Sequence, residues 1–200
     1  MIRIITTSVI LLALAAAPVA AQQAAPAPAL GGPVVPGVCL LSREAVFANA
    51  AVGKAVSARI AELTRAAQAE VDQQRTPLEA EAKALAAQGD DAKTKPRRDA
   101  LATRWQALQR QAAQGSREID ATRTKALARV ADEAQPVIAK VYGERKCGLL
   151  FDRGALLGGN FANDLTAEVV KALDARITTI QFEREKLDQP AAERSSPGTE

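Results

Sequence analysis

The sequence predicts a mostly helical α+β fold, in which a long antiparallel helical hairpin projects from a small β-strand base that oligomerises. Two Ala-rich segments with helical periodicity are separated by a single break at residues 88–96. Short apolar runs at 38–42 and 148–159 flank these segments and favour strands. If the chain folds back near Ala92, facing residues have numbers that sum to about 185, and the two cysteines, Cys39 and Cys147, then meet at the base.

The first 21 residues have the order of a secretory signal peptide. A basic residue, Arg3, precedes an apolar stretch, and small residues precede a cleavage site that we place after Ala21. The apolar stretch is short for the roughly 20 residues of a membrane span, which favours a cleaved peptide over an uncleaved anchor. Residues 22–37 are rich in Ala, Pro and Gly without periodicity, so we expect a disordered leader.

The two cysteines are predicted to form a disulfide. Export to an oxidising compartment favours a bridge over the alternative, which is two free buried thiols. The chain has no histidine, so the pair cannot belong to a usual zinc site.

The helical hairpin is expected over residues 43–146. Ser42 follows the first strand and is a suitable N-cap for the helix after it. Apolar and small residues in the first arm recur at steps of three or four, which is helical spacing. Pro77 is expected to kink this arm. The first stripe comprises Val56, Ile60, Leu63, Ala67, Val71, Gln74, Leu78, Ala82 and Leu85.

The second arm has the alternating spacing of a coiled-coil seam. Its single tryptophan, Trp105, is expected to pack against the first arm near Leu78 or Lys83, with a role in facing cargo as the alternative, and Pro136 is expected to kink the arm near its base. At 1.5 Å per residue, arms of about 45 to 50 residues give a hairpin ~70 Å long. The second stripe comprises Leu101, Trp105, Leu108, Ala112, Gly115, Ile119, Thr122, Ala126, Val130, Ala134, Val137 and Val141.

Charge is distributed unevenly between the arms. Residues 43–92 hold 6 basic and 8 acidic side chains, whereas residues 93–146 hold 13 basic and 6 acidic ones. The net charge of the whole chain, +3, is too small to indicate nucleic-acid binding. A basic cluster marks the tip and is either a solvated turn or a contact for anionic lipid or acidic cargo. It comprises Lys93, Lys95, Arg97 and Arg98.

The base is completed after the second arm. Residues 148–152 and 155–159 are predicted to be two strands around an Arg153-Gly154 turn. A last helix is expected over 166–187, capped by Thr166, followed by a disordered tail at 188–200. Both faces of the strands are apolar, so we expect the base to self-associate. The residues expected there are Leu40, Leu41, Leu149, Leu150, Phe151, Leu156 and Leu157.

Catalysis has no support in the sequence. The chain contains no histidine, no nucleophile-elbow motif and no phosphate-binding loop, so we expect neither an enzyme nor a cofactor or metal site.

Two blocks of the sequence resemble the Skp/OmpH family of periplasmic chaperones. The first is Val38-Cys39-Leu40-Leu41-Ser42-Arg43-Glu44-Ala45-Val46-Phe47, with Ala51-Val52-Gly53-Lys54 after it. The second runs over 148–157 and continues with Asn163-Asp164-Leu165-Thr166 and residues 167–173. The chain departs from the family pattern at Ser42, where many members have Asp, and in its two cysteines.

The resemblance implies a periplasmic trimer, in which a β-body joins three subunits and three helical arms enclose a cavity. It also implies a function, which is to hold unfolded outer-membrane proteins without ATP on their way to the outer membrane. The alternative is a periplasmic coiled-coil adaptor or spacer. Adaptors of this kind carry long β-barrel domains after the hairpin, whereas only about 50 residues follow Lys146 here.

Overall fold

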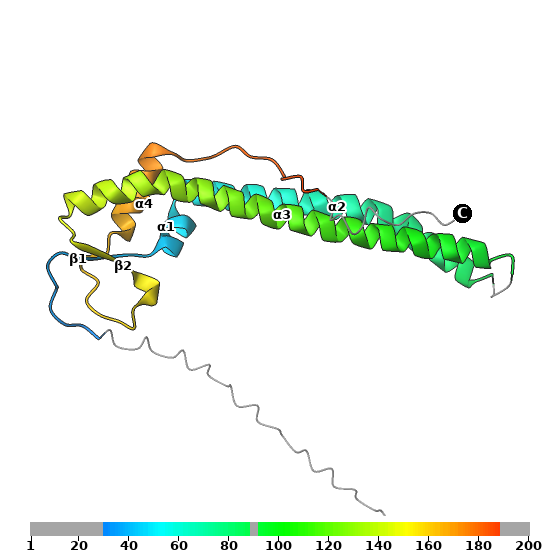
Figure 1. The fold of residues 1–200 in the computed structure, drawn as a ribbon, viewed down its shortest axis with the longest axis horizontal. Coiled ribbons are helices and arrows are strands. Elements are labelled where there is room, and N and C mark those ends of the chain that lie inside the picture. Colours follow the sequence, from blue (N-terminus) through cyan, green and yellow to red (C-terminus); the bar gives the residue numbers. More distant parts are fainter. Residues whose placement is uncertain (1–29, 89–91, 189–200) are drawn as a thin grey trace, which may run out of the picture.

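The computed structural model describes residues 30–88 and 92–188. Two long helices, α2 (Ala51–Ala86) and α3 (Lys95–Glu144), form a hairpin that extends from a small base (Figure 1). The predicted signal peptide, most of the predicted leader and the predicted tail beyond Asp188 lie outside the described residues. The mostly helical fold with strands at its base is confirmed.

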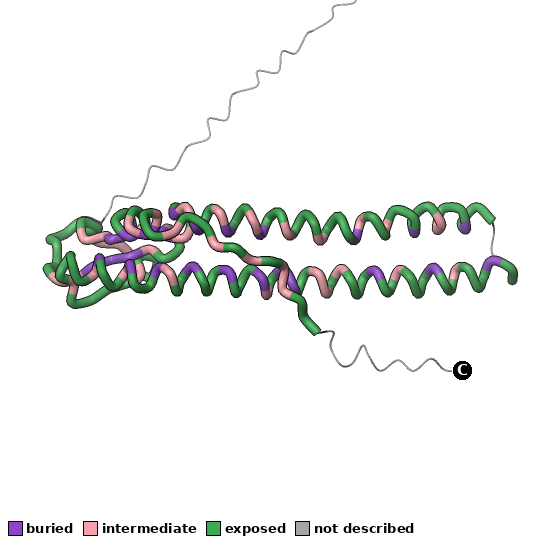
Figure 2. The backbone as a smooth tube through the Cα atoms, turned by 90° about the horizontal axis from the view of Figure 1, so that it is seen from above, coloured by how far each residue is buried: buried purple, intermediate pink, exposed green. Residues whose placement is uncertain are grey.

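The seam between α2 and α3 follows the predicted stripes. Every predicted stripe position of α3 is buried or half-buried, and in α2 only Gln74 is exposed. The fully buried residues form two apolar clusters, one at the base and one toward the tip, where Trp105 packs as expected. Purple segments along the facing sides of the two arms show this burial in Figure 2.

The chain folds back where the sequence predicts. Helix α2 ends at Ala86 and α3 begins at Lys95. An ion pair between Arg104 and Glu81 joins the arms, and these residue numbers sum to about 185, as the fold-back requires. Pro77 and Pro136 lie inside α2 and α3, and the kinks expected there stay predictions.

A corner at Ala50, which the periodicity did not predict, divides the start of the first arm. Ser42 caps helix α1 (Arg43–Asn49), as expected, because its Oγ accepts a hydrogen bond from the Ala45 N–H at 3.1 Å. Helix α2 then begins at Ala51, whose N–H donates to Asp174 Oδ1 at 2.6 Å. The corner is tight, because a Cβ on Gly53 would lie 1.8 Å from the carbonyl oxygen of Phe47.

The base contains a parallel pair of strands, β1 (Val38–Leu41) and β2 (Leu149–Asp152), with Cys39 opposite Leu150. The prediction of a further strand at 155–159 was wrong. Asp152 Oδ1 accepts a hydrogen bond from the Gly154 N–H at 2.9 Å and starts a short 3₁₀ turn, η1 (Arg153–Ala155). The chain therefore turns away after β2, which takes β1 as its partner instead.

Helix α4 (Thr166–Arg176) packs on the base, but its cap differs from the predicted one. Asp164 Oδ1 accepts a hydrogen bond from the Thr166 N–H at 2.8 Å. The Thr166 hydroxyl instead accepts a hydrogen bond from the Ser42 N–H at 2.9 Å. Thr166 therefore joins α4 to the start of α1 rather than capping its own helix.

The prediction that the last helix continues to residue 187 was also wrong. Helix α4 ends at Arg176, and residues 177–188 run as an extended segment along the hairpin (Figures 1 and 2). Residues 177–180 read Ile-Thr-Thr-Ile, and such β-branched side chains disfavour helix because their χ1 angles are restricted against the preceding turn. We call residues 177–188 the strap.

Candidate binding surfaces

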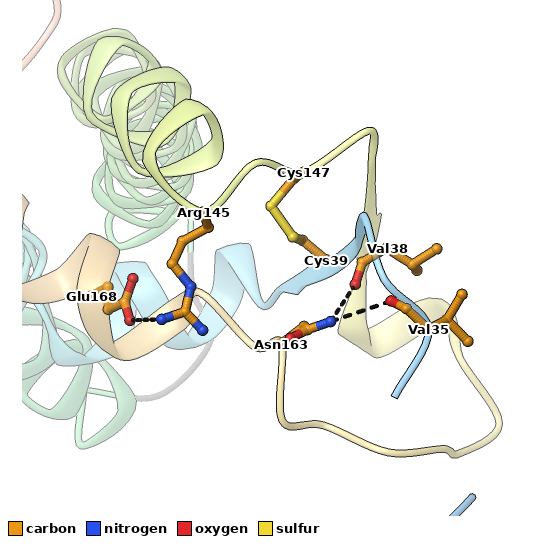
Figure 3. The surroundings of a disulfide bond; sticks show 7 residues. All are labelled: Val35, Val38, Cys39, Arg145, Cys147, Asn163 and Glu168. Carbon is orange, nitrogen blue, oxygen red and sulfur yellow. Dashed lines mark hydrogen bonds and ion pairs between the residues drawn. A yellow bond between two sulfur atoms is a disulfide. The ribbon is translucent and has the colours of Figure 1, made fainter. Parts of the chain in front are cut away.

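The disulfide lies at the junction of hairpin and base (Figure 3). Lys146 has a φ of 53°, a left-handed conformation that ends α3 and turns the chain toward β1. Cys147 follows and is bonded to Cys39, with a Cα–Cα distance of 5.8 Å. The predicted bridge is therefore present in the structure.

Two polar contacts brace the same junction (Figure 3). Asn163 Nδ2 donates hydrogen bonds to the carbonyl oxygens of Val35, at 3.3 Å, and Val38, at 3.1 Å. Arg145, at the end of α3, forms an ion pair of 3.0 Å with Glu168 of α4. The end of α3 is thus fixed to β1 by the disulfide and to α4 by charge.

Exposed apolar side chains gather in β2 and in the turn that follows it. Of the seven residues predicted to form an oligomer base, Leu40 and Leu41 are buried within the chain, in β1. The other five are exposed, and Leu157 is fully so at 104%. We call these five the base patch: Leu149, Leu150, Phe151, Leu156 and Leu157. Large apolar side chains left exposed together in one segment of the chain are typical of an interaction site.

The four basic residues predicted at the tip lie at or near the turn between α2 and α3, where they take part in contacts within the chain. Lys95 pairs with Asp99 at 2.9 Å, and this hydrogen bond raises the pKa of the lysine. Arg97 donates to Gln88 Oε1 at 3.2 Å, and Arg98 donates to the carbonyl oxygen of Leu85 at 3.2 Å. These two arginines therefore also close the turn, and the proposed contact with lipid or cargo stays a prediction.

Between the two apolar clusters the hairpin has a polar waist. A cavity of about 450 Å³ lies here, lined mostly by polar and charged side chains, with small residues such as Ala67, Ala112 and Gly115 among them. Two polar residues of α3 are buried beside it, Glu118 and Thr122, with 7% and 2% of their surface exposed. At the waist, the side chains of α2 and α3 therefore do not fill the space between the two arms.

The strap supplies the missing contacts at the waist. Arg184 inserts there and bonds Glu70 of α2 at 3.0 Å and Glu118 of α3 at 3.3 Å. Glu118 also accepts hydrogen bonds from Gln114 Nε2 at 3.1 Å and from the Leu187 N–H at 3.4 Å. A single side chain of the strap thus bridges the two arms.

The pKa of Glu118 is set by opposing effects. Burial alone would raise it, but the hydrogen bonds from Gln114 and the Leu187 N–H, with the charges of Lys186 and Arg184, hold the pKa below its ordinary value. The largest of the effects that lower the pKa is the hydrogen bond from Gln114 of α3, and the other three come from the strap.

Sequence reasoning missed the strap because the apolar spacing of α4 continues past its end. Ile177 and Ile180 fall at helical steps from Leu173, and this pattern concealed the change to extended chain. Both side chains still pack on the base cluster, as does Phe182. The β-branched run at 177–180 was the signal that could have shown the helix end.

Neither a metal site nor a membrane span is found in the part of the chain that the structure describes. No cluster of metal-ligating side chains occurs among residues 30–88 and 92–188. Within the same ranges no helix combines the length and the apolar character that a membrane crossing requires.

Comparisons with known proteins agree with this architecture. The family model for outer membrane protein (OmpH-like) matches residues 37–173. No curated protein matches the chain. A crystal structure from Caulobacter crescentus, assigned as a candidate outer membrane chaperone (OmpH-like), is 41% identical and has a TM-score of 0.72, and the match covers 80% of this chain and 96% of that one. These matches support a chaperone-type role. The chain belongs to the OmpH-like family.

Proposed function

We propose that the protein is a periplasmic holdase chaperone, which binds unfolded outer-membrane proteins and keeps them soluble without ATP. It acts as a binding protein rather than an enzyme and needs no cofactor. Membership in the OmpH-like family and the likeness to the Caulobacter protein support the chaperone-type part of this proposal.

The observation that carries the proposal is the open hairpin. Helix α3 has 50 residues, so it is about 75 Å long at 1.5 Å per residue. Outside the seam most of its side chains are exposed, and they offer a long, shallow surface. Such a surface suits loose retention of a long chain, because many weak contacts hold it without any one fixed geometry.

Charge adds capture at longer range. Residues 93–146 carry 13 basic and 6 acidic side chains, so the second arm attracts acidic segments before contact. Apolar contacts along the arms then hold the unfolded client, and the free energy of these contacts does not depend on charge.

Self-association through the base patch completes the proposal. Burial of these five exposed side chains between copies would remove them from water, which favours assembly. The resemblance to the Skp/OmpH family implies a trimer, with the hairpins projecting from a shared base.

The test is suppression of aggregation. Mature protein, residues 22–200, is mixed with an outer-membrane β-barrel protein diluted from urea, and light scattering is followed without nucleotide across a salt series. We expect protection at stoichiometric chaperone that weakens with salt, because the Debye length falls from ~10 Å at 0.1 M to ~3 Å at 1 M. Absence of protection, or protection that requires ATP, would remove the holdase proposal.

A charge-matched pair of variants tests the tip. Lys93→Glu with Lys95→Glu reverses two charges near the turn, and Lys140→Glu with Lys171→Glu reverses two near the base. We expect the tip pair to slow capture more than the base pair in stopped-flow mixing with the same barrel protein. Equal rates would show that the capture rate depends only on net charge, and they would exclude a specific contact between the tip and the client.

A further inference from the structure

The hairpin holds the strap partly through the carbonyl groups of its backbone. Arg129 Nη1 donates to the carbonyl oxygen of Gln181 at 2.7 Å, and Gln114 Nε2 donates to that of Leu187 at 2.8 Å. Both donors are side chains of α3, and they contact the strap at two separate places along its length.

Backbone N–H groups of the strap are bound as well. The Glu185 N–H donates to Thr122 Oγ1 at 2.9 Å, and the Leu187 N–H donates to Glu118 Oε1 at 3.4 Å. Residues 185 and 187 are two apart, as expected when alternate N–H groups of an extended chain point to one side. Because every non-proline residue has these backbone groups, the same α3 side chains can bond an extended chain of almost any sequence.

Side chains of the strap indicate which sequences fit best. Ile180 and Phe182 pack on the base cluster, while Glu183 pairs with Arg59 at 2.7 Å and Glu185 pairs with Lys125. These ion pairs lie at the surface, where such contacts contribute little to stability. The strap is therefore held by many modest contacts, and an incoming segment can replace it stepwise.

We propose that the face of the hairpin under the strap is a binding site for an extended segment of an unfolded polypeptide, with apolar residues toward the base and, toward the waist, acidic residues that alternate with basic ones as Glu183, Arg184 and Glu185 do. The strap is the internal occupant of this site, and a client segment displaces it. This inference rests on the proposed holdase function and adds to it the place and chemistry of one client contact.

Hydrogen exchange on the unaltered protein gives the first test. Amides of Glu185 and Leu187 are bonded to α3 and should be protected in the free protein. On addition of the barrel protein diluted from urea, we expect both amides to lose protection while amides inside α3 keep theirs. Unchanged protection of the two strap amides in the client complex would overturn the proposal.

A peptide in place of the strap gives the second test. The probe is a fluorescein-labelled peptide of residues 177–188, followed by fluorescence anisotropy. In the unaltered protein the tethered strap competes at an effective concentration of ~mM, so the peptide should bind weakly. Arg184→Glu removes the bridge to Glu70 and Glu118 and should raise the affinity for the peptide at least about tenfold.

The matched control is Arg110→Glu, which changes the charge equally at an exposed position of α3. Peptide affinity within about twofold of the unaltered protein is expected for this variant. Equal peptide affinity in the two variants would overturn the proposal, and hydrogen exchange on the unaltered protein decides the matter if Arg184→Glu does not fold.

The two proposals fail in different ways. If the unaltered protein does not protect the barrel protein from aggregation, the holdase function fails. If it protects while the strap amides stay protected and Arg184→Glu binds the peptide no more tightly than Arg110→Glu does, the holdase function stands and this site is excluded.

Discussion

Removal of the disulfide should destabilise the protein by an amount that the loop length determines. The bridge between Cys39 and Cys147 closes a loop of 108 residues, which contains the whole hairpin. In the chain-entropy model a loop of this size restricts the unfolded chain by about 4.8 kcal/mol at 25 °C. Residual compactness of the unfolded hairpin makes this figure an upper value.

The assay is urea unfolding of Cys39→Ala with Cys147→Ala, followed by far-UV circular dichroism. With a denaturant dependence of about 2 kcal/mol per M, a loss of about 4.8 kcal/mol lowers the midpoint by about 2.4 M. Samples are compared at one protein concentration, because association of folded chains stabilises them by mass action.

Reduction of the unaltered protein is the matched control. A reducing agent should lower its midpoint to that of the double variant and should leave the double variant unchanged. A midpoint drop below about 0.5 M in both experiments would refute the loop-entropy reasoning, since about 1 kcal/mol would then account for the whole effect.

Three further predictions concern the corner, the waist and the base. Gly53→Ala would place a Cβ 1.8 Å from the backbone of Phe47 and should cost at least about 2 kcal/mol in urea unfolding, whereas Gly115→Ala, with nothing within 4 Å, should stabilise by up to about 1 kcal/mol. When the strap is docked, the pKa of Glu118 lies below the ordinary glutamate value of 4.5. Strap docking should therefore be fully stabilised by Glu118 above pH 4.5, and this stabilisation should be lost as the pH falls through the lowered pKa. The Leu187 amide resonance reports this loss, and Glu118→Gln should reduce the pH dependence, leaving the part that comes from the ion pairs of Glu70, Glu183 and Glu185. Leu157→Asp should dissociate the assembly in analytical ultracentrifugation without loss of helix, and a wild-type protein that is monomeric at micromolar concentration would refute the proposed association.

The seam could be predicted from the sequence because it depends on local spacing alone. In a helix, residues three and four apart share one face, so the stripe from Leu101 to Val141 identifies the buried side without knowledge of its partner. The position of the disulfide followed from the same regularity, since both arms rise equally per residue from one fold-back point.

The corner at Ala50 could not be predicted in this way. Alanine is the best helix former, and nothing in the local sequence stops the helix there. The break depends on contacts between distant residues, because Asp174 of α4 accepts the hydrogen bond from the first N–H of α2. Gly53 then permits the close approach to Phe47.

The strap was missed for a related reason. Ile177 and Ile180 continue the helical spacing of α4, and both an extended and a helical chain can bring them to the base cluster. The extended chain is favoured at the waist of the hairpin, where the buried side chains of Thr122 and Glu118 require hydrogen-bond donors and two N–H groups of the strap supply them. Such a requirement is a property of the packed arms and is absent from the strap sequence.

The hairpin is held by a covalent contact at its base and by the strap at its waist, and this difference affects how the arms can move. At the base the disulfide between Cys39 and Cys147 fixes the end of α3 covalently to β1. At the waist the apolar seam is interrupted by a cavity of about 450 Å³, and Arg184 of the strap bridges α2 and α3 there through non-covalent contacts. Displacement of the strap by a client would therefore release the arms at the waist and leave the base intact. If both proposals hold, the arms could adjust at the waist to clients of different size, because a client would replace one contact that joins them there, while the apolar clusters and the disulfide keep the hairpin and its base together.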